Sequence, residues 1–176
     1  MSAFAKTLSS AALALTVAAG ASFASADAKA ANLAETAAAA GSFQTLIAAA
    51  TAAGAVPYLT GDQPYTVFAP TDDAFAKLPA GTVDNLLLPE NRATLRKIIA
   101  LHIVPGTIPA SAVLGQQVAP LTMALQYIYI NGATANGVFI DTDEADYPSP
   151  NTAQVVQADV MADNGVIHVI DNVLLP

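Results

Sequence analysis

Apolar residues in the first hundred positions recur at intervals of three and four, which places them on one face of a helix. Residues 27–56 are therefore predicted to be helical, with a break at Gly41-Ser42 and Ser42 as the N-cap of the second segment. Gly54 is predicted to end that segment. Its apolar positions are Phe43, Leu46, Ile47, Ala50 and Ala53.

A short β run at residues 65–69 leads into further helices. Thr71 is predicted to be an N-cap, with Asp72 and Asp73 in the first turn, where carboxylates favour the helix dipole. Thr82 is predicted to cap a further short helix, and Pro89 to open the next one. That last helix carries a single apolar stripe ending in a histidine: Leu95, Ile98, Ile99 and His102.

From residue 118 onward the apolar period changes to two, which is typical of strands. The runs are residues 127–130, 138–140, 155–161 and 166–170. Asn-Gly beside apolar runs is the strongest short-range hairpin signal, and it occurs at Asn131-Gly132, Asn136-Gly137 and Asn164-Gly165. Helices followed by antiparallel hairpins predict one α+β domain.

The first 26 residues have the features of an export signal. Lys6 supplies a positive charge, residues 8–19 are apolar and uncharged, and Ala24-Ser25-Ala26 presents the small residues that a signal peptidase reads. The alternatives are an alanine-rich first helix and a membrane anchor, which this short Ala- and Ser-rich stretch disfavours. We expect an exported protein with a mature chain of residues 27–176, located in the periplasm, at the cell surface or outside the cell.

Composition narrows the function classes. Of the 176 residues 54% are hydrophobic, but 40 are alanine and 24 of these precede residue 56, so part of that figure reflects helix propensity. Leu, Ile, Val and Phe supply 47 residues, enough for a packed core. The net charge of −8 becomes −9 on the mature chain, with five basic and fourteen acidic side chains, which disfavours nucleic acid and anionic lipid as partners. The absence of cysteine excludes disulfides, thiolate metal sites and a cysteine nucleophile.

The two histidines are the first candidates for chemistry. His102 ends an apolar helical stripe and His168 alternates with Ile167 and Val169, so both favour buried, hydrogen-bonded structural roles. Asp171 follows three residues after His168, but no serine stands out as an activated nucleophile. We expect no enzymatic activity and no cofactor, and a hydrolase is the least favoured reading.

One acidic loop is a weak metal candidate, through Asp141, Asp143 and Asp146. Clustered carboxylates suit Ca²⁺, yet the EF-hand loop requires Gly at its sixth position and Glu at its twelfth, where this chain has Asp146 and Thr152. A solvated loop without metal is favoured.

Four segments together resemble the fasciclin (FAS1) domain family. TVFAPTDDAFAKLP (residues 66–79) is similar to the family's first signature and NGVIHVIDNVLLP (residues 164–176) to its second. LHIVPG (residues 101–106) stands where the family carries its central Tyr-His motif, and GSFQTLIAAATAAG (residues 41–54) is similar to its opening helix. The resemblance implies an α+β FAS1 fold, with helices packed on a wedge-like, antiparallel-rich β-sandwich of about seven strands.

The resemblance also implies a function. Such domains are secreted or surface-attached adhesion modules, and an Asp-Ile pair and the Tyr-His motif are implicated in adhesion. The matching positions here are Asp159-Val160 and Leu101-His102, so Asp159, Val160 and His102 are the expected partner-binding residues. Val keeps the β-branched shape of Ile, whereas Leu101 lacks the tyrosine hydroxyl and ring. The expected partner is a cell-surface or matrix protein or a polysaccharide, bound weakly; the alternative reading of the signatures is that they specify only the fold.

A periplasmic domain that binds a small ligand or lipid in an apolar pocket between helices and sheet is the second hypothesis. The aromatic residues relevant to this hypothesis are Tyr127, Tyr129 and Phe139. Tyr127 and Tyr129 share a face in one strand pattern. That face is predicted to be buried; if exposed, it would be a ligand-stacking surface.

Overall fold

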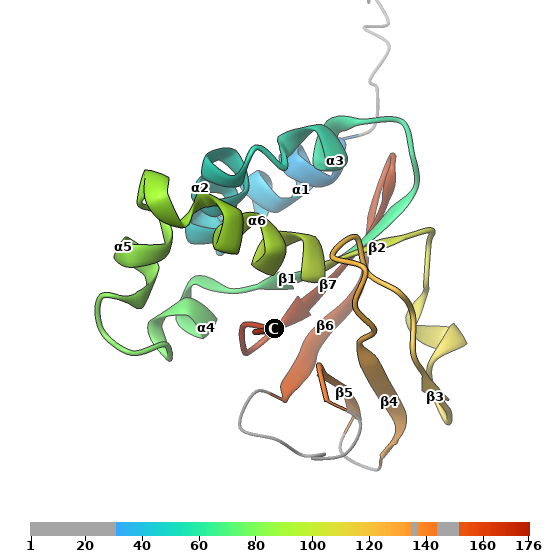
Figure 1. Ribbon diagram of the computed structural model, residues 1–176. Coiled ribbons are helices and arrows are strands. Elements are labelled where there is room, and N and C mark those ends of the chain that lie inside the picture. The colour runs from blue at the N-terminus through green and yellow to red at the C-terminus, as the bar shows by residue number, and fades with distance from the viewer. Residues whose placement is uncertain (1–30, 135–136, 144–151) are drawn as a thin grey trace, which may run out of the picture.

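The computed structural model describes residues 31–134, 137–143 and 152–176, so the predicted export signal lies outside the described residues. Helices come first and most strands later (Figure 1). In chain order the elements are α1 (Leu33–Ala40), α2 (Gln44–Ala53), α3 (Val56–Thr60), β1 (Tyr65–Pro70), α4 (Asp72–Ala76), α5 (Thr82–Leu86), the 3-10 helix η1 (Pro89–Asn91), α6 (Arg92–Leu101), β2 (Ile103–Pro105), the 3-10 helix η2 (Ala110–Ala112), β3 (Gln117–Val118), β4 (Tyr129–Thr134), β5 (Gly137–Asp141), β6 (Ala153–Ala162) and β7 (Gly165–Ile170).

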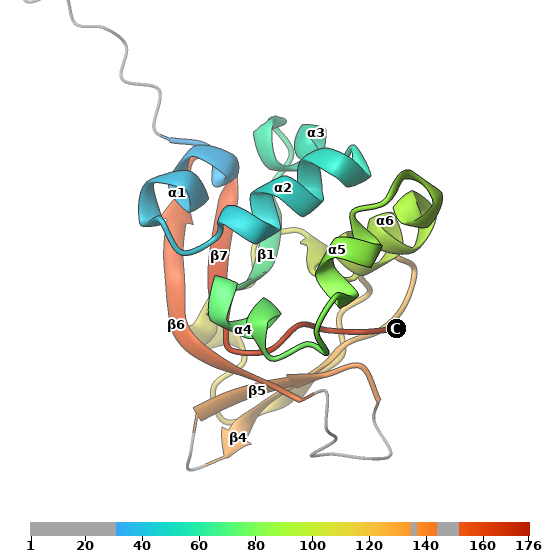
Figure 2. The same cartoon turned by 90° about the vertical axis from the view of Figure 1, so that its left-hand side faces the viewer.

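The described strands form one seven-stranded sheet in the order β2-β1-β7-β6-β5-β4-β3. Every pair of strands is antiparallel except β1 and β7, which run parallel and align Phe68 with His168. The sheet curls: β1 and β7 lie under the helices, and β6 bends away to meet β5 and β4 on the other side (Figure 2). The α+β prediction is confirmed.

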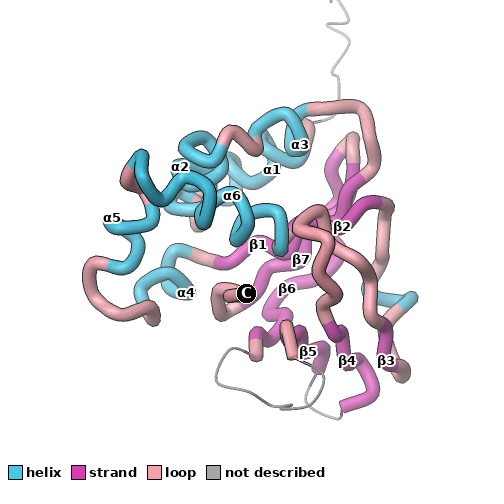
Figure 3. Tube along the Cα trace, in the orientation of Figure 1, coloured by secondary structure: helices cyan, strands magenta, loops and turns pink. Residues whose placement is uncertain are grey.

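The curl separates two cores that share strands β1 and β7. Alternate side chains of a strand point to opposite faces, so Val67 and Ile167 pack toward the helices while Phe68 and Ile170 pack inside the curl. Because both faces of these strands are covered, all six residues of β7 are buried. The α-helices gather on one side of the molecule and the strands β3 to β5 on the other, with β1 and β7 between them (Figure 3).

Several local predictions are confirmed. Gly54 ends α2 with a φ of 70°, and the amide of Ala74 donates to the Thr71 hydroxyl at 3.2 Å, as expected of a cap. The apolar stripe of α6 is buried up to and including His102. Asn164-Gly165 joins β6 to β7 as a hairpin.

Three local predictions are wrong, and for two of them the reason is a contact with a residue far along the chain. Ser42 does not cap α2; the carboxylate of Asp72 accepts from the amides of Thr45 at 2.8 Å and Gln44 at 3.3 Å. Thr82 is the first residue of α5 rather than its cap, because Gly81 occupies that position.

Asn131-Gly132 is not a turn either, since both residues lie within β4. Gly132 packs on the backbone of the segment before β3. Its amide donates to the backbone carbonyl of Gln116 at 3.0 Å, and the amide of Gly115 donates to the Gly132 carbonyl at 2.9 Å. A Cβ at this position would overlap the carbonyl oxygen of Val113, so glycine is required by close approach. The second Asn-Gly does stand at the junction of β4 and β5, which pair antiparallel, although Asn136 lies outside the described residues.

Candidate functional site

Asp159 lies at a break in the pairing of β6 with β7. The register shifts between Gln157 and Val160, and Asp159 adopts a φ of 55°. Aspartate tolerates this left-handed conformation better than most residues, and an extra residue in a strand changes the direction of a side chain. The bulge therefore holds the exposed Asp159 side chain in a direction that a regular strand would not provide.

Hydrogen bonds connect this bulge to two other segments. The amide of Ala110 donates to Oδ1 of Asp159 at 2.8 Å, and the amide of Asp159 donates to Nδ1 of His168 at 3.3 Å. Because Nδ1 accepts, the ring proton is on Nε2, which donates to the carbonyl oxygen of Ile108 at 2.8 Å. Both nitrogens of the buried His168 ring are thus used to hold the bulge and the segment around residues 108–110 in place.

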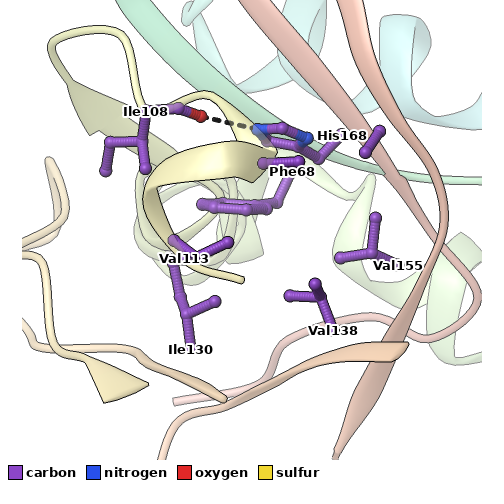
Figure 4. A pocket seen from close by; sticks show the side chains of 9 residues that line it. Phe68, Ile108, Val113, Ile130, Val138, Val155 and His168 are labelled. Carbon is purple, nitrogen blue, oxygen red and sulfur yellow. Dashed lines mark hydrogen bonds between the residues drawn. The ribbon is translucent and has the colours of Figure 1, made fainter. Parts of the chain in front are cut away.

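An apolar pocket lies behind the bulge (Figure 4). The ring of His168 stacks on Phe68, with centroids 5.6 Å apart and an interplanar angle of 24°. The free volume is about 10 Å³, roughly the space of one water molecule. The pocket lies inside the curled sheet rather than between helices and sheet, and in this conformation it is too small for a lipid. Its lining residues are Phe68, Ile108, Ala110, Val113, Ile130, Val138, Val155, Ala158 and His168.

Val160 is oriented differently from its neighbour. It is half-buried and packs against the core on the helix side of the sheet. Of the two residues of this pair, Asp159 therefore presents the polar group, while Val160 helps to anchor β6.

His102 is in the interior, with 1% of its surface exposed. Nδ1 donates to the carbonyl oxygen of Ile98 at 2.8 Å, and Nε2 accepts from the amide of Leu174 at 3.1 Å. Burial lowers the pKa of His102 to about 4, against a smaller opposing effect of the Ile98 hydrogen bond. The buried ring offers no atom to a partner in this conformation, which matches the structural role favoured by its apolar stripe.

The first residue of the acidic loop, Asp141, accepts hydrogen bonds from other residues of the same segment. Asp141 is fully buried and accepts from the amides of Thr142 at 2.7 Å and Asp143 at 3.2 Å, and from the hydroxyl of Thr152. Asp146 lies outside the described residues. Within the described ranges, no three His, Cys, Asp or Glu side chains come close enough together to hold a metal ion.

The tyrosine prediction is wrong for its first residue. Tyr127 is 53% exposed and Tyr129 is half-buried, so this face is not part of the core. Sequence reasoning also missed Ile108 and Ala110, whose backbone groups hold the bulge. No motif marks them, because main-chain donors and acceptors occur at nearly every position.

Comparison of the sequence with known proteins identifies related proteins along most of the chain. The sequence model of the Fasciclin domain matches residues 41–176. Protein sll1483 of Synechocystis sp. is 49% identical over 135 residues, covering 76% of this chain and 67% of that protein. The uncharacterized protein sll1735 of the same organism is 38% identical over 133 residues, covering 76% of this chain and 89% of that protein.

More distant similarities extend to animals. Transforming growth factor-beta-induced protein ig-h3 of Sus scrofa is 34% identical over 136 residues, which span 18% of that longer protein. A solved FAS1 domain pair from the insect cell adhesion molecule Fasciclin I superposes with a TM-score of 0.57, over 74% of this chain and 44% of that one. At 21% identity this likeness bears on the fold alone.

Among the described residues, no helix combines the length and apolar character needed to cross a membrane. The match of the family model over residues 41–176 and the closely similar bacterial relatives decide the assignment: this chain belongs to the fasciclin domain family.

Proposed function

We propose that this chain is an exported, non-catalytic adhesion or surface-interaction module, which binds a cell-surface or matrix protein or polysaccharide weakly through the β6 bulge. The observation that carries the proposal is the geometry of Asp159, an exposed carboxylate at a strand bulge that backbone hydrogen bonds hold in one direction. Oδ1 accepts from Ala110, and a carboxylate has further lone pairs to offer a partner.

The surroundings of the bulge support an interaction surface. In the part of the chain that the structure describes, β6 pairs with β5 at Ala153 and Gln154 alone, so the later residues of β6 have one strand neighbour there, β7. Val156 is 57% exposed and Met161 is 67% exposed on this length of strand. An exposed strand edge with apolar side chains and a fixed charge is a common recognition surface.

The histidines support the absence of catalysis. Each ring nitrogen of His102 and His168 is hydrogen-bonded to the main chain, so neither ring is placed to transfer protons to a substrate. The fold points in the same direction, since the FAS1 domain pair with which this chain superposes comes from an insect cell adhesion molecule. Export is proposed from the leader-like first 26 residues.

Bead attachment tests the proposal. Beads coated with many copies of the domain raise a weak affinity through multivalency, and their attachment to cells of the source organism is counted. Asp159→Asn keeps the side-chain oxygen that accepts from Ala110 but removes the charge, so we expect attachment to fall several-fold while the fold is retained. Asp163→Asn is the matched control, because Asp163 is an exposed carboxylate in the turn that follows the same strand. Equal attachment of the wild-type and Asp159→Asn beads would refute the proposed site.

A further inference from the structure

The basic residues of this acidic protein are unevenly distributed. The described ranges contain four, and three of them lie on α6: Arg92, Arg96 and Lys97. The fourth, Lys77, forms the one ion pair found in these ranges, with Asp171 at 3.1 Å. The α6 cations therefore keep their charge uncompensated by any described carboxylate within ion-pair distance.

A groove lies beside two of these cations. It is formed where α3, α6, the start of β2 and the turn before β4 meet, and its volume is about 260 Å³. This volume is far larger than that of the pocket behind the β6 bulge and lies just below the usual size of small-ligand pockets. Its lining residues are Ala55, Tyr58, Ala93, Arg96, Lys97, Ala100, Ile103, Met123 and Ala124.

The groove exists because of the spacing of small residues on α6. Ala93 and Ala100 are seven residues apart and so lie on one side of the helix, with Arg96 and Lys97 between them. Their methyl groups leave the space that larger side chains would fill. The opposite side of α6 is packed into the core through Leu95, Ile98 and Ile99, so this wall of the groove is rigid.

The other walls are also held in place. The amide of Met123 donates to the carbonyl of Ile103 at 2.8 Å, and the amide of Thr122 donates to the carbonyl of Gln126 at 3.0 Å, which closes the turn. Tyr58 is 39% exposed, and its ring meets that of Tyr65 edge-on at 6.1 Å. A ligand in the groove would therefore find apolar and aromatic walls without having to order them first.

Arg96 is positioned by the end of α2. Its Nε donates to the carbonyl of Ala53 at 3.0 Å, which uses one of the five guanidinium N–H donors and leaves four others. Arg92 makes the equivalent bond to Ala52 at 2.9 Å, one helical turn away, but does not line the groove.

We propose that this groove binds a small carboxylate with an apolar body. The apolar walls take the hydrocarbon part, and Arg96 and Lys97 take the carboxylate. The site lies apart from the β6 bulge, and it does not depend on the adhesion function proposed above. A ligand of about ten non-hydrogen atoms held by one such charge contact is expected to bind with a roughly millimolar dissociation constant.

Octanoate is the probe, and octan-1-ol is its uncharged counterpart with the same chain. Titration of the full mature chain, followed by amide chemical shifts in NMR, should give saturable shifts for octanoate at Ala93, Lys97 and Ala100. Octan-1-ol should bind up to about fivefold more weakly, the upper end of what the loss of one exposed charge contact costs. Equal binding of the two probes, or octanoate shifts centred on the β6 bulge, would overturn the proposal.

Two variants and a matched control locate the charge. Arg96→Gln should weaken octanoate binding about fivefold, whereas Arg92→Gln, which loses the same charge and an equivalent hydrogen bond, should leave it within about twofold. If Arg96→Gln fails to fold, Lys97→Glu serves instead, because Lys97 is exposed and a charge reversal there should abolish the preference for octanoate over octan-1-ol. The proposed site would be contradicted if Arg92→Gln weakened octanoate binding as much as Arg96→Gln does. It would also be contradicted if Lys97→Glu kept the wild-type preference for octanoate over octan-1-ol.

Discussion

The neutral state of His102 makes the stability of this domain depend on pH. The ring is buried, Nδ1 donates to Ile98 and Nε2 accepts from Leu174, so a second ring proton would face the Leu174 amide. Burial lowers the folded-state pKa to about 4, from 6.5 in the unfolded chain. Between these values the unfolded chain binds more protons, so the free energy of unfolding falls as pH falls through 6.5 toward 4.

The magnitude follows from the shift. One pKa unit corresponds to about 1.4 kcal/mol, so lowering the pH from 8 to 4.5 removes about 2.5 kcal/mol of the roughly 3 kcal/mol available. Urea denaturation at a series of pH values measures this loss. His102→Gln provides the comparison, because glutamine keeps an acceptor for Leu174 and does not titrate. The difference between the two proteins isolates His102, since all other ionisable groups are shared.

We expect the two stability curves to converge as the pH falls. The wild type should lose about 2.5 kcal/mol more than His102→Gln between pH 8 and 4.5. Parallel curves would refute the reasoning. An NMR titration of the wild-type His102 ring gives a test that needs no variant: a measured pKa near 6.5 would show that burial does not control its protonation.

Two further predictions concern backbone contacts between distant segments. Asp72→Ala should cost about 1–2 kcal/mol of unfolding free energy in urea denaturation, because α2 loses its cap at Thr45, while Asp73→Ala on the same exposed turn should cost less than about 0.5 kcal/mol. A smaller effect for Asp72→Ala than for Asp73→Ala would exclude the capping role. Gly132→Ala should cost about 3 kcal/mol, because the new Cβ overlaps the Val113 carbonyl; Gly81→Ala, whose φ is 82° but whose surroundings are open, should cost about 1 kcal/mol in the same assay. Equal costs at the two glycines would argue against the close approach.

Asp72 also carries a titration signature of its capping role. Burial acts to raise the pKa of its carboxyl, but the hydrogen bonds from Thr45 and Gln44 outweigh that effect and hold the pKa below its ordinary value. The associated stability is present above pH 4 and is lost only at more acidic pH. The contribution of Asp72 to the free energy of unfolding therefore stays nearly constant between pH 8 and 4.5, where the effect of His102 is measured.

Elements specified by neighbouring residues were predictable from the sequence. The stripe of α6, the glycine stop of α2, the Thr71 cap and the β6–β7 hairpin each depend on residues within a few positions of one another. The family signatures add the α+β fold and the location of the Asp159-Val160 pair in the sequence. The reason is physical: capping, helical periodicity and tight turns are short-range interactions, so their determinants are adjacent in the chain.

Only the tertiary structure decided which distant groups meet. Asp72 caps a helix that begins 28 residues earlier, Gly132 accommodates a carbonyl from another segment, and Ala110 holds Asp159 across the curled sheet. The groove beside Arg96 likewise needs α3, α6 and the turn before β4 in one place. These contacts depend on strand register and on the bend of β6, which are set by how two cores pack on opposite faces of the same strands. Short-range patterns therefore determined the elements of this protein and its signature motifs indicated the family, whereas the packing of those elements decided which distant groups come together at the β6 bulge and at the groove beside Arg96.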